Sequence, residues 1–303
     1  MASRRTRGAR ATKQITPALL GRWPLPALDP RLGKVARGRV LVVGGSDEIP
    51  GAVILAAIAA LRAGAGTLTI ATSRHIAPHV AVAVPEARVI GLRTTASGEI
   101  APTSTRVLRD ELERSDAIVV GPGMMDGRAA TDAVTRCGAD ATVVLDAGAL
   151  EIVAELPANK RPPHMMITPH AGEMATLLDV TSDEVLARPQ ALARQAAKDL
   201  GAIVVLKGRV TYIVAPDGTC FANTAGNLGL GTSGSGDTLS GVIAGFAARG
   251  AEPMQAAVWG VHVHASAGDV LARDIAPLGY LARELLAEIP RLVDKFSKRR
   301  RRR

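Results

Sequence analysis

Residues 39–71, "RVLVVGGSDEIPGAVILAAIAALRAGAGTLTIA", decide the fold that we expect for this chain. The stretch begins and ends with short β-branched runs, at 39–43 and 67–71, and an Ala/Leu-rich segment at 51–64 separates them. Apolar strands that alternate with helices are typical of a parallel sheet covered by helices on both faces. The stretch therefore predicts one strand–helix–strand unit of an α/β fold.

The same alternation continues toward the C-terminus. Further apolar strands are expected at 117–120, 142–146, 164–167 and 202–206. A helix is expected over 181–201, interrupted or offset at Pro189. Residues 209–223, "RVTYIVAPDGTCFAN", differ because their "PDG" turn predicts an antiparallel hairpin.

Together these elements predict one doubly wound, mostly parallel α/β domain with helices on both faces of its sheet. We place this domain at residues 34–290. A flexible basic segment is expected before it, at 1–33, and a basic tail after it, at 291–303.

The composition of the chain indicates a large apolar core and no membrane segment. The chain has 303 residues, of which 47% are hydrophobic. No apolar run approaches the ~20 residues that a membrane span needs, and the basic N-terminus lacks the apolar region of a signal peptide. Cys137 and Cys220 have no metal or redox spacing, so we expect two reduced thiols in a cytoplasmic protein without a membrane partner.

The net charge of +9 comes from the two ends of the chain. Residues 1–13 carry five positive charges and residues 295–303 carry seven, with no acid in either segment, which leaves −3 for the rest. Basic tails can bind nucleic acid or anionic surfaces without sequence preference. Neither end has aromatic residues or a folded basic face, so we expect solvated tails and no nucleic-acid contact beyond non-specific ones.

Polar and glycine-rich loops follow five of the expected strands. In an open parallel sheet, ligands bind beyond the carboxyl ends of the strands. We therefore expect a binding site where these loops meet. They are "GGSDEIPGA" (44–52), "GPGM" (121–124), "DAGAL" (146–150), "TPHAGE" (168–173) and "KGR" (207–209).

The segment 223–250, "NTAGNLGLGTSGSGDTLSGVIAGFAARG", contains eight glycines and leads into a stretch with helical apolar spacing. Glycine loses the most entropy on folding, so such a loop usually serves a close backbone approach. The N–H groups of Gly234, Ser235 and Gly236 at the start of the helix would bind an anion. Asp237 would then accept a proton from a hydroxyl group that is being phosphorylated; alternatively, it only caps the helix. The loop is not a Walker P-loop, because no GxxxxGK[ST] occurs in the chain.

These motifs together resemble the ADP- or ATP-dependent (S)-NAD(P)H-hydrate dehydratases of the ribokinase-like superfamily. The glycine-rich motif with Asp237 is similar to the GxGD motif of the whole superfamily. "TPHxGE" at 168–173 and "GGSxxxxGAxxLAAxAALRxGAG" at 44–66 narrow the resemblance to the dehydratases. The matching pieces span most of the chain in the family's order.

The resemblance implies a repair reaction. A nucleotide, assisted by Mg²⁺, would phosphorylate the hydroxyl group of hydrated NADH or NADPH, and the phosphate would then leave to restore the reduced cofactor. ADP would give AMP and phosphate, or ATP would give ADP and phosphate. The resemblance also implies a homo-oligomer, by this analogy a tetramer, and leaves the metal ligands unassigned.

The resemblance also assigns site residues. Asp237 would be the catalytic base and would touch the substrate. The other substrate contacts would be Ala52, Gly123 and His170. The adenine-nucleotide site would consist of Lys207, Gly208, Arg209, Val210, Thr211 and Gly236.

Several of these residues also have purely structural interpretations. Gly123 could make the "GPG" turn and Ala52 could pack within a helix. His170 could cap the helix that follows it, and Lys207 could be a solvated lysine of a hairpin. Four histidines carry no functional assignment. His262 and His264 belong to an expected helix at 253–272 and should be core or interface residues, and His75 and His79 lack a third metal ligand.

The chain departs from the family pattern at a few positions and leaves two other functions open. The departures, which bear on metal placement and substrate affinity, are Ile49, Gly148, Leu228, Ser233 and Ser235. No N-terminal epimerase domain is expected, since only a short segment precedes residue 34. One alternative function is a ribokinase-like kinase acting on a vitamin-like alcohol, and the other is a nucleic-acid-associated protein tethered by its basic tails.

Overall fold

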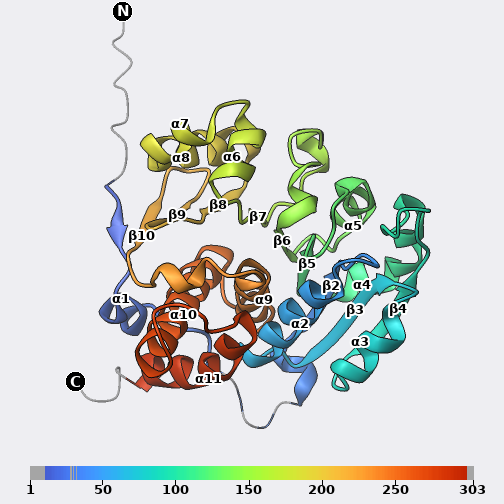
Figure 1. Cartoon of the computed structure of the whole chain (residues 1–303), viewed down its shortest axis with the longest axis horizontal. Helices are drawn as coiled ribbons and strands as arrows, with labels where there is room; N and C mark the ends of the chain where they lie inside the picture. Colours follow the sequence, from blue (N-terminus) through green and yellow to red (C-terminus); the bar gives the residue numbers. More distant parts are fainter. Residues whose placement is uncertain (1–10, 28, 30, 32, 299–303) are drawn as a thin grey trace, which may run out of the picture.

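The computed structural model describes residues 11–27, 29, 31 and 33–298. Its strands form one sheet in the order β1-β10-β9-β8-β7-β6-β5-β2-β3-β4 (Figure 1). The strands are β1 (Lys13–Gln14), β2 (Arg39–Val43), β3 (Thr67–Ser73), β4 (Arg88–Leu92), β5 (Ala117–Val120), β6 (Thr142–Leu145), β7 (Met165–Ile167), β8 (Ile203–Leu206), β9 (Thr211–Val214) and β10 (Cys220–Asn223).

The sheet is mostly parallel and doubly wound, as the sequence predicts. Neighbouring strands from β4 to β8 all pair in parallel, and the chain order reverses where β2 lies between β3 and β5. The expected hairpin is present, since β9 pairs antiparallel with both β8 and β10. Strand β4 was not predicted. Only Leu92 of its five residues is buried, so it lacks the continuous apolar pattern of the inner strands.

Helices cover both faces because successive strand residues point to opposite sides of the sheet. In β2, Val40 and Val42 join one hydrophobic core while Leu41 and Val43 join the other. The helices that contribute to the first core are α1 (Pro17–Arg22), α2 (Pro50–Arg62), α3 (Ala77–Ala83), α9 (Ser235–Ala248), α10 (Pro253–Asp274) and α11 (Ala282–Lys298). Those of the second are α4 (Arg109–Arg114), α5 (Ala130–Thr135), α6 (Ala171–Leu178), α7 (Ser182–Ala187) and α8 (Pro189–Leu200).

Short 3-10 helices connect several of these elements. They are η1 (Lys34–Arg37), η2 (Pro102–Leu108), η3 (Gly127–Ala129), η4 (Ala147–Leu150), η5 (Ala158–Lys160) and η6 (Leu228–Leu230). The break expected near Pro189 is also present. Helix α7 ends at Ala187, and Pro189 begins α8 at a first-turn position where its missing N–H costs nothing.

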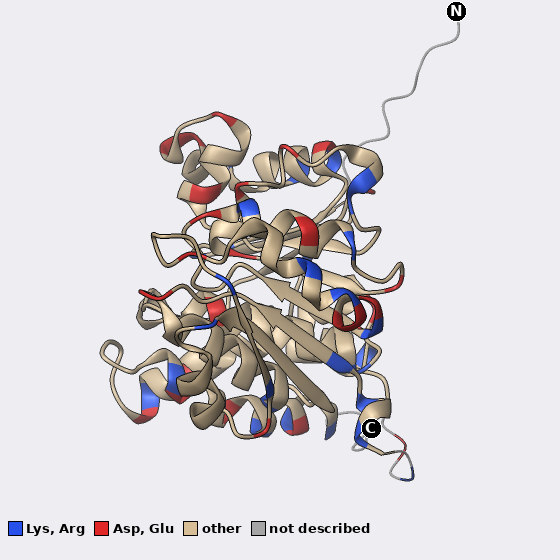
Figure 2. Ribbon diagram, turned by 90° about the vertical axis from the view of Figure 1, so that its right-hand side faces the viewer, with Lys and Arg blue, Asp and Glu red and all other residues tan. Residues whose placement is uncertain are grey.

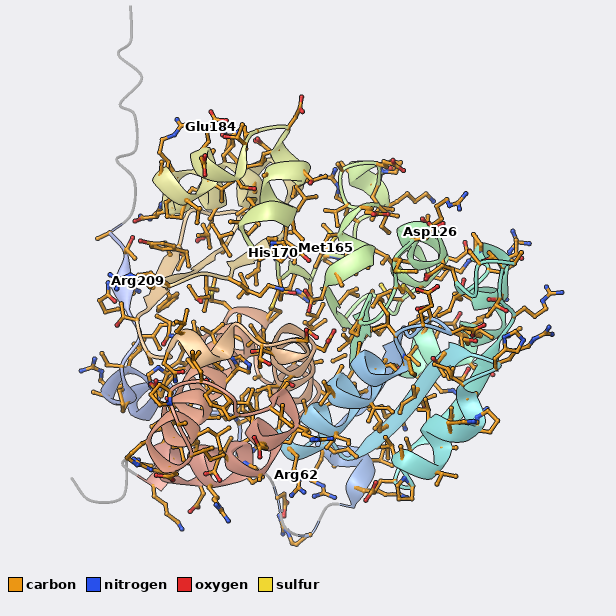
Figure 3. All side chains as sticks on the ribbon, in the orientation of Figure 1. Arg62, Asp126, Met165, His170, Glu184 and Arg209 are labelled. Atoms are coloured by element: carbon orange, nitrogen blue, oxygen red, sulfur yellow. The ribbon has the colours of Figure 1, made fainter. Side chains whose placement is uncertain are left out.

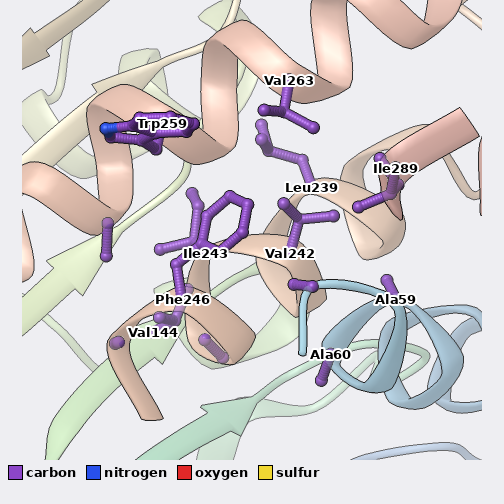
Figure 4. Packing of buried hydrophobic residues seen from close by; sticks show 14 of the residues in the cluster. Ala59, Ala60, Val144, Leu239, Val242, Ile243, Phe246, Trp259, Val263 and Ile289 are labelled. Carbon is purple, nitrogen blue, oxygen red and sulfur yellow. The ribbon is translucent and has the colours of Figure 1, made fainter. Parts of the chain in front are cut away.

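Helix α9 is deeply placed, with 12 of its 14 residues buried, and its amino end leads to the carboxyl edge of the sheet. Its Leu239, Val242, Ile243 and Phe246 pack among side chains of α2, α10 and α11 (Figure 4). A Cβ added to Gly241 would collide with the carbonyl oxygen of Ala56 in α2. This glycine therefore allows the two helix backbones to approach closely, and the contact fixes where the first turn of α9 lies.

The predicted domain limits of 34 and 290 are too narrow for the described residues. Before residue 34, β1 pairs with β10, Leu20 is fully buried, and the Trp23 ring stacks on Phe221 at 5.9 Å. After residue 290, α11 continues to Lys298 and buries Phe296. These ends pack because they carry apolar side chains among their basic ones. Residues 1–10 and 299–303 lie outside the described part of the chain.

Charged residues lie mainly on the helices and loops around the sheet (Figure 2). Among the described residues, no helix is both long and apolar enough to cross a lipid bilayer. Cys137 and Cys220 are free thiols. His262 and His264 are buried in α10, where they bond to Asn223 and Ser235, so the expectation of core histidines is confirmed.

Candidate functional site

Asp237 lies in the first turn of α9, directly after the glycine-rich loop. The helix begins after Gly234, which has a φ of 86° and so adopts the left-handed conformation that favours glycine. Burial raises the pKa of the Asp237 carboxyl to about 6, the negative charge of Asp146 adds to the rise, and the positive charge of Lys207 opposes it. A carboxylate with this pKa can accept a proton near neutral pH.

Lys207 lies at the centre of a cluster of charged side chains. It follows β8, and its ammonium nitrogen is 2.9 Å from Asp146 Oδ1 and 3.7 Å from Glu173 Oε2. Burial by itself would lower the pKa of Lys207, but the carboxylates of Asp146, Glu173 and Asp237 outweigh it and raise the pKa. Lys207 is therefore a cation held among acids, and not the solvated hairpin lysine that the sequence left open.

The glycine-rich turn lies against this cluster. A Cβ added to Gly236 would be 3.2 Å from Lys207 Nζ and 3.6 Å from Asp146 Oδ2. The preceding residue, Ser235, is buried with its hydroxyl 3.2 Å from His264 Nε2. The amino end of α9 and a lysine ammonium thus face the same small space, and both attract an anion.

His170 caps the amino end of α6. Its Nδ1 accepts hydrogen bonds from the backbone N–H groups of Gly172 and Glu173, at 3.0 and 3.3 Å. In return, Glu173 Oε2 accepts one from the His170 N–H at 2.7 Å. The histidine side chain is 60% exposed beside the charged cluster, so the capping role leaves its outer face open to a ligand.

Ala52, in the first turn of α2, and Gly123, in the loop after β5, lie together. A Cβ added to Gly123 would be 2.5 Å from the Ile49 carbonyl oxygen and 3.2 Å from Ala52 Cβ. Gly123 also has a φ of 72°. Both residues are buried, so the turn geometry and helix packing explain why they are small.

The remaining nucleotide-site residues follow Lys207 into the hairpin. Gly208 and Arg209 are exposed, and Val210 and Thr211 are half-buried at the start of β9. Arg209 lies at the side of the sheet where β9 and β10 are found (Figure 3). In the structure, Lys207 therefore lies close to Asp237. Gly208 to Thr211 continue from Lys207 into the hairpin of β9.

A hollow of about 380 Å³ lies next to the charged cluster. Its lining comes from the loops after β5 and β6 and from α6: Met124, Met125, Ala147, Gly148, Leu150, Glu151, Ala154, Glu173, Thr176 and Leu177. A second hollow, of about 450 Å³, includes Asp116, Thr142 and Gly250. It lies at the amino ends of the strands, away from the charged cluster, so we place the site at the first hollow.

The pattern of strand-end motifs and the charged cluster agree with one protein family. Residues 40–291 match the model of the NAD(P)H-hydrate dehydratases. The chain belongs to this family. An ADP-dependent (S)-NAD(P)H-hydrate dehydratase of Xanthomonas campestris is 46% identical over 288 residues, which cover 94% of this chain and 98% of that protein.

Solved structures show the same family and fold. The chain is similar to the ADP/ATP-dependent NAD(P)H-hydrate dehydratase of Bacillus subtilis co-crystallised with ATP and Mg²⁺, at a TM-score of 0.81 and 32% identity over 94% of this chain and 99% of that one. It is also similar to a ribokinase-like superfamily protein of Enterococcus faecalis, at a TM-score of 0.80 and 27% identity over 95% and 97% of the two chains. The fold is therefore ribokinase-like, as the sequence predicts.

Sequence reasoning did not assign Asp146 or the ionic role of Glu173. Asp146 was visible only as the first residue of "DAGAL" after a strand, and Glu173 only as the start of a helix. The structure also explains one departure from the family pattern. A Cβ added to Gly148 would collide with the Met124 carbonyl oxygen, so a larger residue at 148 would require the neighbouring loop to move.

The other departures have simpler surroundings. Ile49 and Leu228 are exposed large side chains, at 40% and 81%, so neither is held by the core. Ser233 is exposed, and Ser235 is the buried partner of His264.

Proposed function

We propose that the protein repairs damaged nicotinamide cofactor by the nucleotide-dependent dehydration of (S)-NAD(P)H hydrate to NAD(P)H. The observation that carries the proposal is Asp237, a carboxylate whose pKa is raised to about 6, beside an anion-binding helix end and Lys207. Family membership and the names of the relatives support this activity. They do not support the vitamin kinase or the nucleic-acid-associated protein.

The residues fit the chemistry of hydroxyl phosphorylation. Asp237 takes the proton of the ring hydroxyl group, and the hydroxyl oxygen attacks the terminal phosphorus of the nucleotide. The P–O bond to AMP, or to ADP when ATP is the donor, breaks as the new bond forms. The N–H groups of the α9 turn and the Lys207 ammonium stabilise the charge on the phosphoryl group. The ring nitrogen then expels phosphate, which is a far better leaving group than hydroxide, and loss of a proton from the adjacent ring carbon restores the double bond of NAD(P)H.

The two ligands would occupy neighbouring strand ends. Ala52, Gly123 and His170 surround the part of the edge that we assign to the hydrated dinucleotide, with Asp237 reaching its hydroxyl. The nucleotide would lie along Lys207 to Thr211, with its phosphates at Gly236. This assignment is supported by the hydrogen bond from the backbone N–H of Lys207 to the carbonyl oxygen of Pro169, at 2.8 Å, which joins the loop after β7 to the segment after β8.

Magnesium fits as an ion that arrives with the nucleotide. Among the described residues, no three His, Cys, Asp or Glu side chains are placed to hold a metal ion. Mg²⁺ is commonly held by phosphates, water and one or two carboxylates, so a preformed cage is not required. Glu173, which is partly exposed beside the site, is the carboxylate that would reach the ion. The ion would neutralise phosphate charge.

We also propose a cytoplasmic homo-oligomer, with a tetramer as the expected form. Free cysteines fit a reducing compartment. The exposed apolar side chains of Ile275, Leu278 and Leu281, at 54%, 60% and 43%, fit a surface that another copy covers.

The test is recovery of the absorbance of reduced nicotinamide. Hydrated NADH and hydrated NADPH are each incubated with the protein, Mg²⁺ and either ADP or ATP. We expect recovery that depends on protein and nucleotide, with AMP or ADP released in proportion to the reduced cofactor. No recovery with either nucleotide, from a protein that binds ADP, would refute the function. A vitamin-like alcohol phosphorylated in its place would favour the kinase alternative.

A further inference from the structure

Asp146 is the most deeply placed acid of the charged cluster. It follows β6 and is only 2% exposed. The Asp146 N–H donates to the Val120 carbonyl oxygen at 3.1 Å. A Cβ added to Gly121 would collide with the carbonyl oxygen of Asp146. Ala147, the next residue, has a φ of 48°, which is uncommon for a residue other than glycine. The backbone around Asp146 is therefore held in one arrangement.

The Asp146 carboxylate fixes the position of the Lys207 ammonium group. The side chains of Lys207 and Asp146 are 22% and 3% exposed, and they are joined at 2.9 Å. A long lysine side chain loses much rotamer freedom in such a pair, and a buried carboxylate would be costly without its cation. Asp146 thus places the ammonium beside Gly236, at the transfer point, rather than out along the nucleotide hairpin.

Glu173 is less suited to this task. Its Oε2 lies 3.7 Å from Lys207 Nζ and also accepts the N–H of His170 at 2.7 Å. Its carboxylate is therefore held mainly as part of the cap of α6. Asp146 provides the shorter and more buried ionic contact.

We propose that Asp146 is a positioning residue for phosphoryl transfer, and that Lys207, held by it beside Gly236, contacts the phosphoryl group during the transfer. This inference rests on the proposed function. As the substrate oxygen forms its bond to phosphorus and the bond to the departing nucleotide breaks, negative charge collects on the departing phosphate. The Lys207 ammonium stabilises that charge without giving up a proton, and Asp237 receives the proton of the hydroxyl.

A double-mutant cycle on the full chain tests the inference. Asp146→Asn, Lys207→Met and the double variant are compared with the parent protein in kcat with hydrated NADH and ADP, in ADP affinity by calorimetry, and in Tm. We expect Lys207→Met to lower kcat about 100-fold or more, as loss of a charge-stabilising donor does. Asp146→Asn should lower kcat about 10- to 100-fold, by analogy with the loss of partners that orient a reactive group.

The decisive result is the double variant. If Asp146 acts through Lys207, the double variant should lose no more kcat than Lys207→Met, within about three-fold. ADP affinity should change less than kcat in all three variants. A double variant whose loss in kcat equals the product of the two single losses would overturn the inference. An unchanged kcat in Asp146→Asn, or a loss confined to ADP affinity, would also overturn it. If Asp146→Asn does not fold, Asp146→Glu replaces it: kcat should fall with ADP binding retained, and an unchanged kcat would overturn the inference.

Asp116→Asn provides the matched control. Asp116 precedes β5 at the opposite edge of the sheet, is exposed, and accepts the Arg39 N–H at 2.7 Å. This variant should keep the kcat of the parent. A parent protein that binds ADP but does not restore NADH would refute the proposed function together with this inference, whereas an active parent with multiplying losses would refute the inference alone.

Discussion

Asp237 shows how surroundings change the chemistry of one residue. A carboxylate in the first turn of a helix is normally stabilised in its charged form by the helix dipole. Here burial and the nearby Asp146 carboxylate act in the opposite direction, and the pKa of Asp237 rises to about 6. Asp237 therefore exchanges a proton near neutral pH, whereas a carboxylate that only caps a helix would be fully ionised there.

Replacing Asp237 by Asn should abolish most turnover while the protein remains folded. Asn is nearly isosteric and still suits a helix start, but it cannot accept the hydroxyl proton. We expect kcat to fall by about 10²- to 10⁴-fold, with ADP affinity and Tm close to those of the parent. Turnover within a few-fold of the parent would show that Asp237 is only a helix residue.

The same pKa predicts how activity depends on pH. Asp237 acts in its deprotonated form, so activity should fall as the pH drops through about 6. The measurement is kcat/KM for hydrated NADH between pH 5 and 8, with protein integrity checked at each pH. A profile that stays flat down to pH 5 would contradict the assignment of Asp237 as the base.

At the level of elements, α9 combines two uses of glycine. Gly234 and Gly236 shape the turn that faces the charged cluster, whereas Gly241 and Gly245 lie where Cβ atoms would press into the α2 backbone. The first pair serves the site and the second pair serves helix packing. Because the packing fixes α9 against α2, it also fixes where the turn meets Lys207.

Gly241→Ala should therefore destabilise the protein, although alanine favours helices. The new Cβ would collide with the Ala56 carbonyl oxygen. Forced repacking of this kind costs about 1–3 kcal/mol in the free energy of unfolding. The control is Gly51→Ala in α2, where a Cβ would meet nothing within 4 Å. That change should stabilise the protein by about 0.5 kcal/mol. Urea unfolding curves give both values, and equal stability of the two variants would contradict the packing role.

At the scale of the whole molecule, the domain uses more of its two ends than its charge pattern indicates. Lys13 belongs to β1, and Lys295 and Lys298 belong to α11, so three of the twelve positive charges assigned to tails lie on packed elements. The remaining nine fall in residues 1–10 and 299–303. Any non-specific affinity for nucleic acid should depend on these nine charges.

Removing residues 1–10 and 299–303 should leave turnover of hydrated NADH within about two-fold of the parent. The charged cluster lies at the edge of the sheet, and its ion pairs are all with residues that the shortened chain retains. Salt-dependent binding to a random DNA duplex should weaken strongly in the same variant. Titrations at two salt concentrations and the absorbance assay test both statements. A large loss of turnover in a folded variant would mean that these ends take part in the site.

The sequence by itself determined the features that depend on neighbouring residues. The strand–helix–strand pattern of 39–71, the break at Pro189, the "PDG" hairpin and the cap by His170 each follow from periodicity, proline geometry or capping within a few positions. The end-of-strand rule then predicted a site at the edge of the sheet where the structure gathers Asp146, Lys207 and Asp237. The resemblance to one family added the roles of single residues, which remain proposals.

Only the tertiary structure decided which distant residues meet. Asp146 and Lys207 are 61 positions apart, and their ion pair exists because β6, β7 and β8 are neighbours in the sheet. The same is true of Gly241 against Ala56, of β1 on β10, and of α11 packing beyond Pro290. Local patterns specify which way a side chain faces, but burial and the pKa of Asp237 depend on every element that surrounds it. That is why the sequence singled out Asp237 as the proposed base but not the buried Asp146 beside it.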